Sequence, residues 1–227
     1  MNINDIQHKN TTNKLTLIQK TAAESKKHQF YSGLLTGIID SSLSSYPVLL
    51  KSQIQANKVP TNKVGENRYI IGFGLSNSIG YTISSEILSA ALSTANELIM
   101  RPGITGSRIK AASIPFIFCR EASFWQGVNL NKEQTNESNS SPIRALACQA
   151  VFGGAIANIF DTLVGYSNAR EKGFKETCNW AIKQPFEFSY VFKHSLPIRM
   201  FGCVCTPFIA VQLINSPHSP IKKWLDK

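Results

Sequence analysis

Long apolar stretches with very little charge alternate with short polar breaks along most of the chain. Three of them, residues 29–50, 69–96 and 145–165, each contain a single charged residue, respectively Asp40, Glu86 and Asp161. Each stretch reaches the roughly 20 residues that an α-helix needs to cross a bilayer core. None has the regular polar face typical of a surface helix in a soluble protein. The pattern therefore predicts an all-α protein that spans a membrane.

Polar segments divide and flank these stretches. Residues 55–68 are expected to form a polar loop, and residues 129–141, which are low in apolar content, a flexible one. The first 28 residues lack the apolar core of a secretory signal, so we expect a disordered polar extension there. Residues 216–227 are predicted to be a polar C-terminal tail, which leaves a membrane domain at 29–215.

Small residues recur four positions apart near the start of three apolar segments. The pairs are Gly33 with Gly37, Ser89 with Ser93, and Gly153 with Ala157. This spacing lets helix backbones approach closely, which matters most in lipid, where the hydrophobic effect does not drive helices together. The pairs thus favour packed membrane helices.

Two kinds of helical unit alternate along the chain. Pro47 follows Gly33 by 14 residues and Pro102 follows Ser89 by 13, whereas the third segment has no proline at the corresponding place. A second unit, "SRIKAASIPFIF" at 107–118 and "IRMFGCVCTPFIAV" at 198–211, joins an arginine to a later Pro-Phe-Ile. We therefore expect three degenerate two-helix repeats. Their approximate bounds are 29–86, 87–128 and 142–215.

Several of these segments resemble the mitochondrial carrier family. "ACQAVFGGAIANIFDTLVGYSNAR" and "YSGLLTGIIDSSLSSYPVLLKSQIQ" are similar to odd-numbered carrier helices, and "GFKETCNWAIKQ" to the short matrix helix. "VFKHSLPIRMFGCVCTPFIAVQLI" and "IPFIFCREASF" resemble even-numbered helices. The resemblance covers roughly residues 30–215 and is best over 145–215. It implies a six-helix membrane bundle around a central cavity, in an inner or outer mitochondrial membrane.

The chain departs from the charged signature of that family, Pro-x-acidic-x-x-basic, whose charges form a gate. Three repeats of about 100 residues do not fit into 227, so the first two are shortened. All six gate positions are neutral here: Leu49, Ser52, Ile104, Ser107, Gly165 and Asn168. The same residues that indicate carrier ancestry thus argue against ordinary carrier gating.

Charged residues inside the apolar segments are the candidate functional residues, because a charge at membrane depth is costly. The acidic candidates are Asp40, Glu86 and Asp161, with Glu121 beside Arg120, and the substrate-binding candidates are Arg120, Arg199, Arg108 and Phe116. Arg120 matches a position where the family places a cation in the cavity; the alternative is that Arg120 and Glu121 lie at a helix end or pair with acidic neighbours. Arg199 resembles the family's arginine near the membrane boundary, and we expect it to snorkel to the interface. Asp40 and Asp161 could equally cap a helix or pair with a basic residue.

Composition and motifs limit the partners and functions that the chain is expected to have. The net charge of +10 admits an anionic solute or membrane surface, but no nucleic-acid-binding motif or basic cluster accompanies it, so no nucleic-acid partner is expected. No catalytic motif or metal-ligand spacing is present, so we expect neither an enzyme nor a cofactor. The five cysteines form no CxxC pair and are predicted to be reduced.

Three functions stay open at this point. The first is carrier-like transport of a small anionic metabolite through a central cavity between the repeats. The second is a non-transporting membrane scaffold, adaptor or insertase derived from a carrier, with a protein partner. The third is a soluble helical interaction protein. The first two require the lipid bilayer as a partner.

Overall fold

The computed structural model describes residues 27–48, 50–51, 63–100, 107–137 and 141–227, and over these residues the chain is helical with no strand. The predicted all-α class is confirmed. Residues 27–48 and 50–51 are helical and are together called the N-terminal helix. It is followed by α2 (Lys63–Thr82), α3 (Glu86–Met100), α4 (Ser107–Asn136), α5 (Pro142–Cys148), the π-helical segment η1 (Gln149–Ile156), α6 (Ala157–Arg170) and α7 (Phe174–Lys183). The chain ends with α8 (Pro185–Met200), the π-helical segment η2 (Phe201–Cys205), α9 (Thr206–Asn215) and α10 (Pro220–Leu225).

Two of the helices are long composites. The run from α5 through η1 to α6 spans Pro142–Arg170, and the run from α8 through η2 to α9 spans Pro185–Asn215. Among the described residues, these two are the helices long and apolar enough to cross a membrane. Their π-helical segments pack against each other, and such segments occur often at functional sites.

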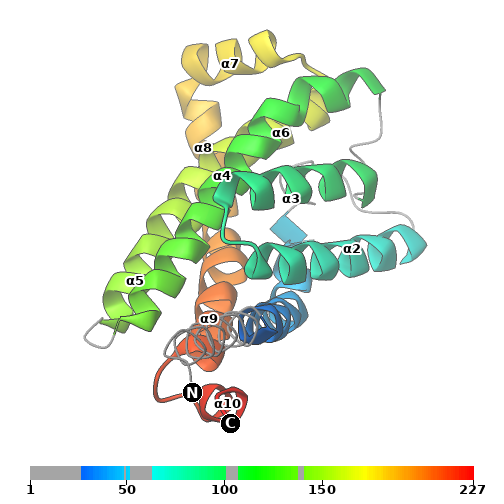
Figure 1. Cartoon of the computed structure of the whole chain (residues 1–227). Helices are drawn as coiled ribbons and strands as arrows, with labels where there is room; N and C mark the ends of the chain where they lie inside the picture. The colour runs from blue at the N-terminus through cyan, green and yellow to red at the C-terminus, as the bar shows by residue number, and fades with distance from the viewer. Residues whose placement is uncertain (1–26, 49, 52–62, 101–106, 138–140) are drawn as a thin grey trace, which may run out of the picture.

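Helix α4 lies at the centre of the bundle. It packs against α3 on one side, against η1 and α6 on another, and against α9 as well. In Figure 1, α2 and α3 lie side by side, and α7 and α10 mark opposite ends of the molecule. Residues far apart in sequence can thus meet around α4.

Close helix contacts occur where the small residues predict them. A Cβ on Gly37 would lie 2.4 Å from the Ser78 Cα of α2, and one on Gly33 would lie 2.7 Å from the Thr82 Oγ1. Ser93 accepts a hydrogen bond from the Trp125 indole at 2.9 Å, which ties α3 to α4. The predicted role of these positions in helix packing is therefore confirmed.

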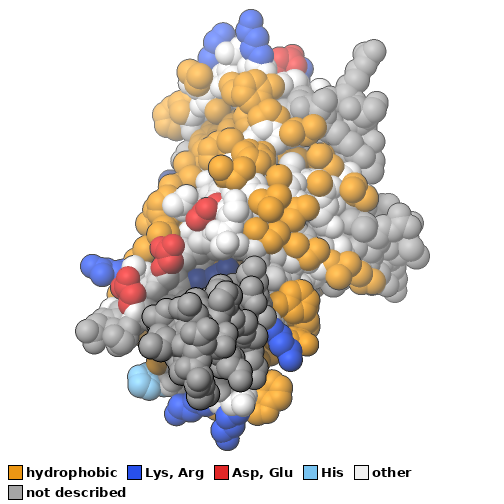
Figure 2. Space-filling view, in the orientation of Figure 1, with side chains coloured by type: hydrophobic (Ala, Val, Ile, Leu, Met, Phe, Trp, Pro, Cys, Tyr) orange, Lys and Arg blue, Asp and Glu red, His pale blue; other side chains and the backbone are white. Residues whose placement is uncertain are grey.

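The distribution of side chains is inverted relative to a soluble protein. Among the described residues, buried polar and charged side chains outnumber buried hydrophobic ones, while large hydrophobic side chains on every long helix are exposed. Figure 2 shows hydrophobic side chains over the middle of the visible face, with Lys and Arg side chains mainly at its upper and lower ends. The polar groups therefore lie inside, and the apolar ones face the surroundings.

A short helix packs across one end of α6. The chain turns at Glu171, whose φ of 54° is left-handed, and α7 then starts with the Gly173 N–H donating to the Glu176 carboxylate at 3.0 Å. This hydrogen bond, and then the charge of Lys172, lower the pKa of Glu176. The Trp180 ring stacks on Tyr166 at 3.8 Å and holds α7 against α6.

Two predictions about polar segments meet different outcomes. The flexible loop expected at 129–141 is wrong for most of its length, because α4 continues to Asn136. Three of its polar side chains, Asn129, Asn131 and Thr135, are buried, and Gln212 of α9 donates to Thr135 at 3.1 Å, which stabilises a helix contact. The predicted polar tail contains α10. The predicted disordered extension, apart from residues 27 and 28, lies outside the described residues.

Candidate functional site

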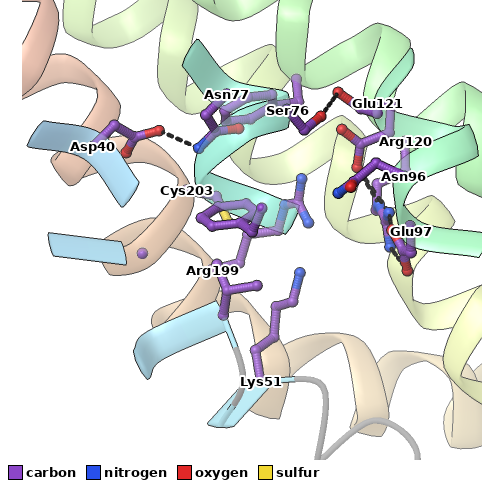
Figure 3. Close-up of a pocket in the computed structure, with 15 residues that line it drawn as sticks. Asp40, Lys51, Ser76, Asn77, Asn96, Glu97, Arg120, Glu121, Arg199 and Cys203 are labelled. Atoms are coloured by element: carbon purple, nitrogen blue, oxygen red, sulfur yellow. Dashed lines mark hydrogen bonds and ion pairs between the residues drawn. The ribbon is translucent and has the colours of Figure 1, made fainter. Parts of the chain in front are cut away.

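A cavity of about 50 Å³ lies inside the helix bundle, between the N-terminal helix, α2, α3, α4, α8 and η2. Its lining is rich in charged side chains. In Figure 3, Asp40 lies on one side, Arg120 and Glu97 lie on the other, and Lys51 and Arg199 lie between them. The site thus draws residues from helices that are distant in sequence.

Asp161 is the centre of a buried cluster of ion pairs next to this cavity. Its carboxylate accepts a hydrogen bond from the Arg120 guanidinium at 2.9 Å and pairs with Lys51 and with Arg199. The Asp161 side chain is 1% exposed. The Asp161 carboxylate of α6 therefore forms ion pairs with side chains from the end of the N-terminal helix, from α4 and from α8.

Arg120 is the second centre of the cluster. It pairs with Glu97 of α3 and donates to the adjacent Glu121 at 2.7 and 3.0 Å. Because its planar fork has several N–H groups, a single guanidinium can bind three carboxylates at once. The predicted alternative, pairing with acidic neighbours, is confirmed, and the partners include two helices beyond its own.

Arg199 corrects an expectation. We expected it to snorkel to the membrane boundary, but it is 2% exposed. Its Nε donates to the Gly153 carbonyl within η1 at 2.9 Å, and its guanidinium pairs with Asp161. These internal partners compensate for the loss of water, so the side chain does not need to reach the surface.

The ion-pair cluster is balanced in charge. It consists of Lys51, Arg120, Arg199, Glu97, Glu121 and Asp161, three cations and three carboxylates. Buried ions are costly unless they are paired and hydrogen-bonded, and here each cation has a carboxylate partner. The cluster thereby fastens five helices together at the centre of the bundle.

Asp40 lies across the cavity in a different environment. It is 1% exposed, and its carboxylate accepts hydrogen bonds from the Asn77 amide at 2.9 Å, the Tyr81 hydroxyl at 3.2 Å and the Thr206 hydroxyl at 2.8 Å. These donors come from α2 and α9 and are all neutral. Neither proposed role of Asp40, helix capping or pairing with a basic residue, is seen among the described residues.

The other predicted site residues lie away from the cavity. Phe116 is 4% exposed and stacks on Phe174 of α7 at 4.7 Å, in a hydrophobic cluster with Ile117 and Trp180. It is a packing residue, because the apolar segment around Pro115 turns its ring toward α7. Glu86 is half-buried in the first turn of α3, a position favoured for an acid at a helix N-terminus. The side chain of Arg108 lies outside the described residues.

Sequence reasoning missed two members of the cluster, Lys51 and Glu97. A signal for Glu97 was present, since Ser89, Ser93 and Glu97 are each four residues apart, as are Gly153, Ala157 and Asp161. Residues four apart share a helix face, so both acids extend a close-packing face. Both indeed bind Arg120. Lys51 follows Pro47 at the end of an apolar segment and gives no comparable signal.

Other chemistry has little support at this site. All five cysteines are free, in agreement with the predicted reduced thiols. In the described part of the chain, no group of His, Cys, Asp and Glu side chains is placed to hold a metal ion. The chemistry available to the site is ion pairing, hydrogen bonding and proton exchange.

Comparison with known proteins gives no relative. No protein-family model matches the chain, and neither a curated protein nor a solved structure matches it. The function therefore has to be argued from the site itself.

Proposed function

We propose that this protein is a membrane-embedded, carrier-like transporter of a small anionic solute, and that its charged centre is the solute path. The observation that carries the proposal is the buried ion-pair cluster in a bundle whose apolar side chains face outwards. Ionisable residues buried at membrane depth are expensive and usually lie on solute or ion pathways. In an anion path, the three cations of the cluster are the groups that would bind the solute.

The repeated faces of α3 and α6 support the proposed ancestry. Ser89–Ser93–Glu97 and Gly153–Ala157–Asp161 place two small residues and an acid at the same spacing, and both acids meet Arg120. Equivalent faces on two helices are the expectation for degenerate repeats. We therefore keep the mitochondrial carrier resemblance, with six membrane helices in three repeats and a mitochondrial membrane, as part of the proposal.

The cavity beside the ion-pair cluster is too small to hold a metabolite, so under this proposal the structure corresponds to a closed state of the transporter. A volume of about 50 Å³ is well below the roughly 300–1,000 Å³ of small-molecule sites. A solute carboxylate or phosphate would have to replace Asp161 as the partner of Arg120 and Arg199. Arginine binds both groups in a bidentate manner, so such an exchange keeps the cations satisfied. The Asp161 carboxylate in the closed state and the solute anion in the bound state would thus be alternative partners of the same cations.

The same small cavity also supports a second candidate function, a non-transporting membrane scaffold or insertase. If the three cations never exchange their carboxylate partners, the cluster is only a fastening between helices. Transport assays separate the two candidates, and a protein partner would be required only by the second.

A membrane location has a direct test. Replacing Val151 with lysine should impair membrane insertion, because this side chain is 50% exposed about a third of the way along the Pro142–Arg170 helix. A lysine at a bilayer centre costs about 2.5–3.5 kcal/mol on insertion scales. The fraction that resists carbonate extraction measures the effect. Ile182→Lys is the matched control, since Ile182 is 77% exposed on α7, outside both candidate spans.

Two results would contradict this location. Wild-type protein released into the aqueous phase by carbonate, or a Val151→Lys variant as membrane-bound as Ile182→Lys, would favour the soluble helical alternative. In water an exposed valine and an exposed isoleucine both tolerate lysine.

The transport proposal predicts a large effect of Arg120→Lys. Lysine keeps the charge but loses the planar fork that holds several carboxylates, so anion uptake should fall at least about tenfold. Proteoliposomes loaded with unlabelled anion and given labelled inorganic phosphate, malate or ADP measure uptake. Arg170→Lys is the control, since the Arg170 side chain is 64% exposed at the end of α6. Unchanged uptake in Arg120→Lys would remove Arg120 from the solute path.

A further inference from the structure

Asp40 is the buried carboxylate at the centre of the bundle that the ion-pair cluster leaves out. Its three hydrogen-bond donors, Asn77, Tyr81 and Thr206, are neutral. Among the described residues, no lysine or arginine forms a salt bridge with it, whereas Glu97, Glu121 and Asp161 each have one. An ion without a counter-ion in a low-dielectric interior costs several kcal/mol and is usually relieved by neutralisation.

Asp40 also lines one polar cavity and is hydrogen-bonded to a residue that lines a second. The cavity of about 50 Å³ begins at Asp40 and extends toward Lys51 and Arg199. A second cavity of about 350 Å³ is lined by the preceding part of the same helix, from His28 to Thr36, and by Tyr81. Thr36 is one helical turn before Asp40, and Tyr81 both lines the second cavity and donates its hydroxyl to Asp40. Asp40 therefore borders the first cavity directly and is joined to the second through the Tyr81 hydroxyl.

The charge of this region depends on Asp40. Over the described residues the ion-pair cluster is neutral, so a charged Asp40 adds one negative charge beside it, which repels an incoming anion. The titratable and charged groups around Asp40 and the cavity that it lines are Tyr81 on α2, Cys203 in η2, Arg199 on α8, Glu97 on α3, Arg120 and Glu121 on α4, and Lys51. The second cavity adds His28 and Lys132, and Lys132 donates to the Tyr81 carbonyl at 2.9 Å. A neutral Asp40 would remove the excess negative charge and favour the anion.

We propose that Asp40 is a proton-binding site that couples proton movement to anion transport. The coupling rests on the proposed transport function, whereas proton binding at Asp40 stands on the geometry alone. The carboxylate takes up a proton from the cavity lined by His28, Thr36 and Tyr81 and becomes a neutral carboxylic acid. It then releases the proton toward the cavity that contains the cluster. One proton and one anionic charge move together, so the charge of the centre is restored after each cycle.

The groups around the carboxylate argue against a metal cation as its ligand, and the Tyr81 and Thr206 hydroxyls can turn to accept the proton of a neutral acid. A sodium ion at this place would need several oxygen lone pairs directed at it. Asn77 instead presents its amide N–H to Asp40, and Tyr81 and Thr206 present hydroxyl groups that donate. Buried carboxylic acids in such surroundings serve as relays in proton-coupled membrane proteins.

Proton binding is tested without any transported solute. Infrared difference spectra of the full-length protein in lipid vesicles, recorded across a pH titration, should contain the C=O stretching band of a buried carboxylic acid. The band should be lost in Asp40→Asn, which resembles the neutral acid in shape, and kept in Glu86→Gln, a half-buried acid outside the site. A band that survives in Asp40→Asn, or its absence from the wild type at every pH, would overturn the proton site. So would a band whose titration shifts with sodium but not potassium, since it would indicate a cation in place of the proton.

Coupling is tested with the same variants in proteoliposomes. Uptake of labelled malate or phosphate should rise severalfold when the outside is more acidic than the inside, and uptake by Asp40→Asn should no longer depend on the gradient. Uptake that ignores the pH gradient in the wild type would overturn the coupling and leave transport intact. No uptake of any probe anion under any gradient would overturn transport, and the infrared result would then still decide whether Asp40 binds a proton.

Discussion

Replacing Asp161 with asparagine is expected to be among the most damaging single changes in this protein. Asp161 is the shared partner of Lys51, Arg120 and Arg199. Its loss would leave Lys51 and Arg199 without a carboxylate partner among the described residues, whereas Arg120 would keep Glu97 and Glu121. Breaking one buried ion pair by removing a partner costs about 3–5 kcal/mol, because an uncompensated charge stays in the interior. For a chain of this size the midpoint of thermal unfolding should fall on the order of 10 °C. Tryptophan fluorescence during heating in detergent measures it.

A second substitution separates charge balance from simple loss of contacts. In Asp161→Asn combined with Lys51→Met, two cations, Arg120 and Arg199, remain with two carboxylates, Glu97 and Glu121. Glu97 and Glu121 both pair with Arg120, while Arg199 keeps its hydrogen bond to the Gly153 carbonyl. The double variant should therefore recover part of the lost stability. Glu86→Gln is the control for removing an acid outside the cluster. If Asp161→Asn unfolds like Glu86→Gln, the cluster does not stabilise the bundle.

The helical class and much of the close packing could be predicted from the sequence, because both depend on local patterns. Runs of some 20 residues with a single charge predict helices. Gly33 and Gly37 predict that another helix packs closely here, but they do not identify that helix. The structure supplies the neighbour, α2 at Ser78 and Thr82. Helix continuity through 129–136 was missed because polarity was attributed to solvent exposure, whereas these side chains bond across to α9.

Most members of the charged site were predicted from the sequence, but Lys51, Glu97 and the contacts between the members were not. Asp161 and Arg120 stood out as charges in apolar segments, yet they lie 41 positions apart, and a single sequence does not give distances between helices. The neutral family gate positions suggested that cross-bundle ion pairs had been lost. Lys51, Glu97 and Asp161 instead form such pairs from other positions on the N-terminal helix, α3 and α6. The family signature specifies sequence positions for the gate charges, whereas an ion pair between helices requires only that opposite charges lie close together in space.

Replacing Gly37 with alanine is expected to separate the N-terminal helix from α2. The added Cβ would lie 2.4 Å from the Ser78 Cα and 2.5 Å from its backbone nitrogen. Backbone atoms cannot rotate away as a flexible side chain can, so the helices must move apart, and such overpacking costs about 1–3 kcal/mol or more. Because Asp40 is one turn further along the same helix and is held by Asn77 and Tyr81 of α2, the displacement should weaken those hydrogen bonds as well.

Gly74→Ala is a matched control between the same two helices. Its Cβ would lie 3.6 Å from Ser41, an ordinary contact, and alanine favours a helix over glycine by up to about 1 kcal/mol. Gly74→Ala should therefore leave the thermal unfolding midpoint unchanged or raise it, whereas Gly37→Ala should lower it. Equal midpoints for the two variants would mean that the helices do not approach as closely as the Gly37–Ser78 contact requires. The pH titration of the Asp40 band in Gly37→Ala would then be unaltered too, because the carboxylate would keep its donors on α2.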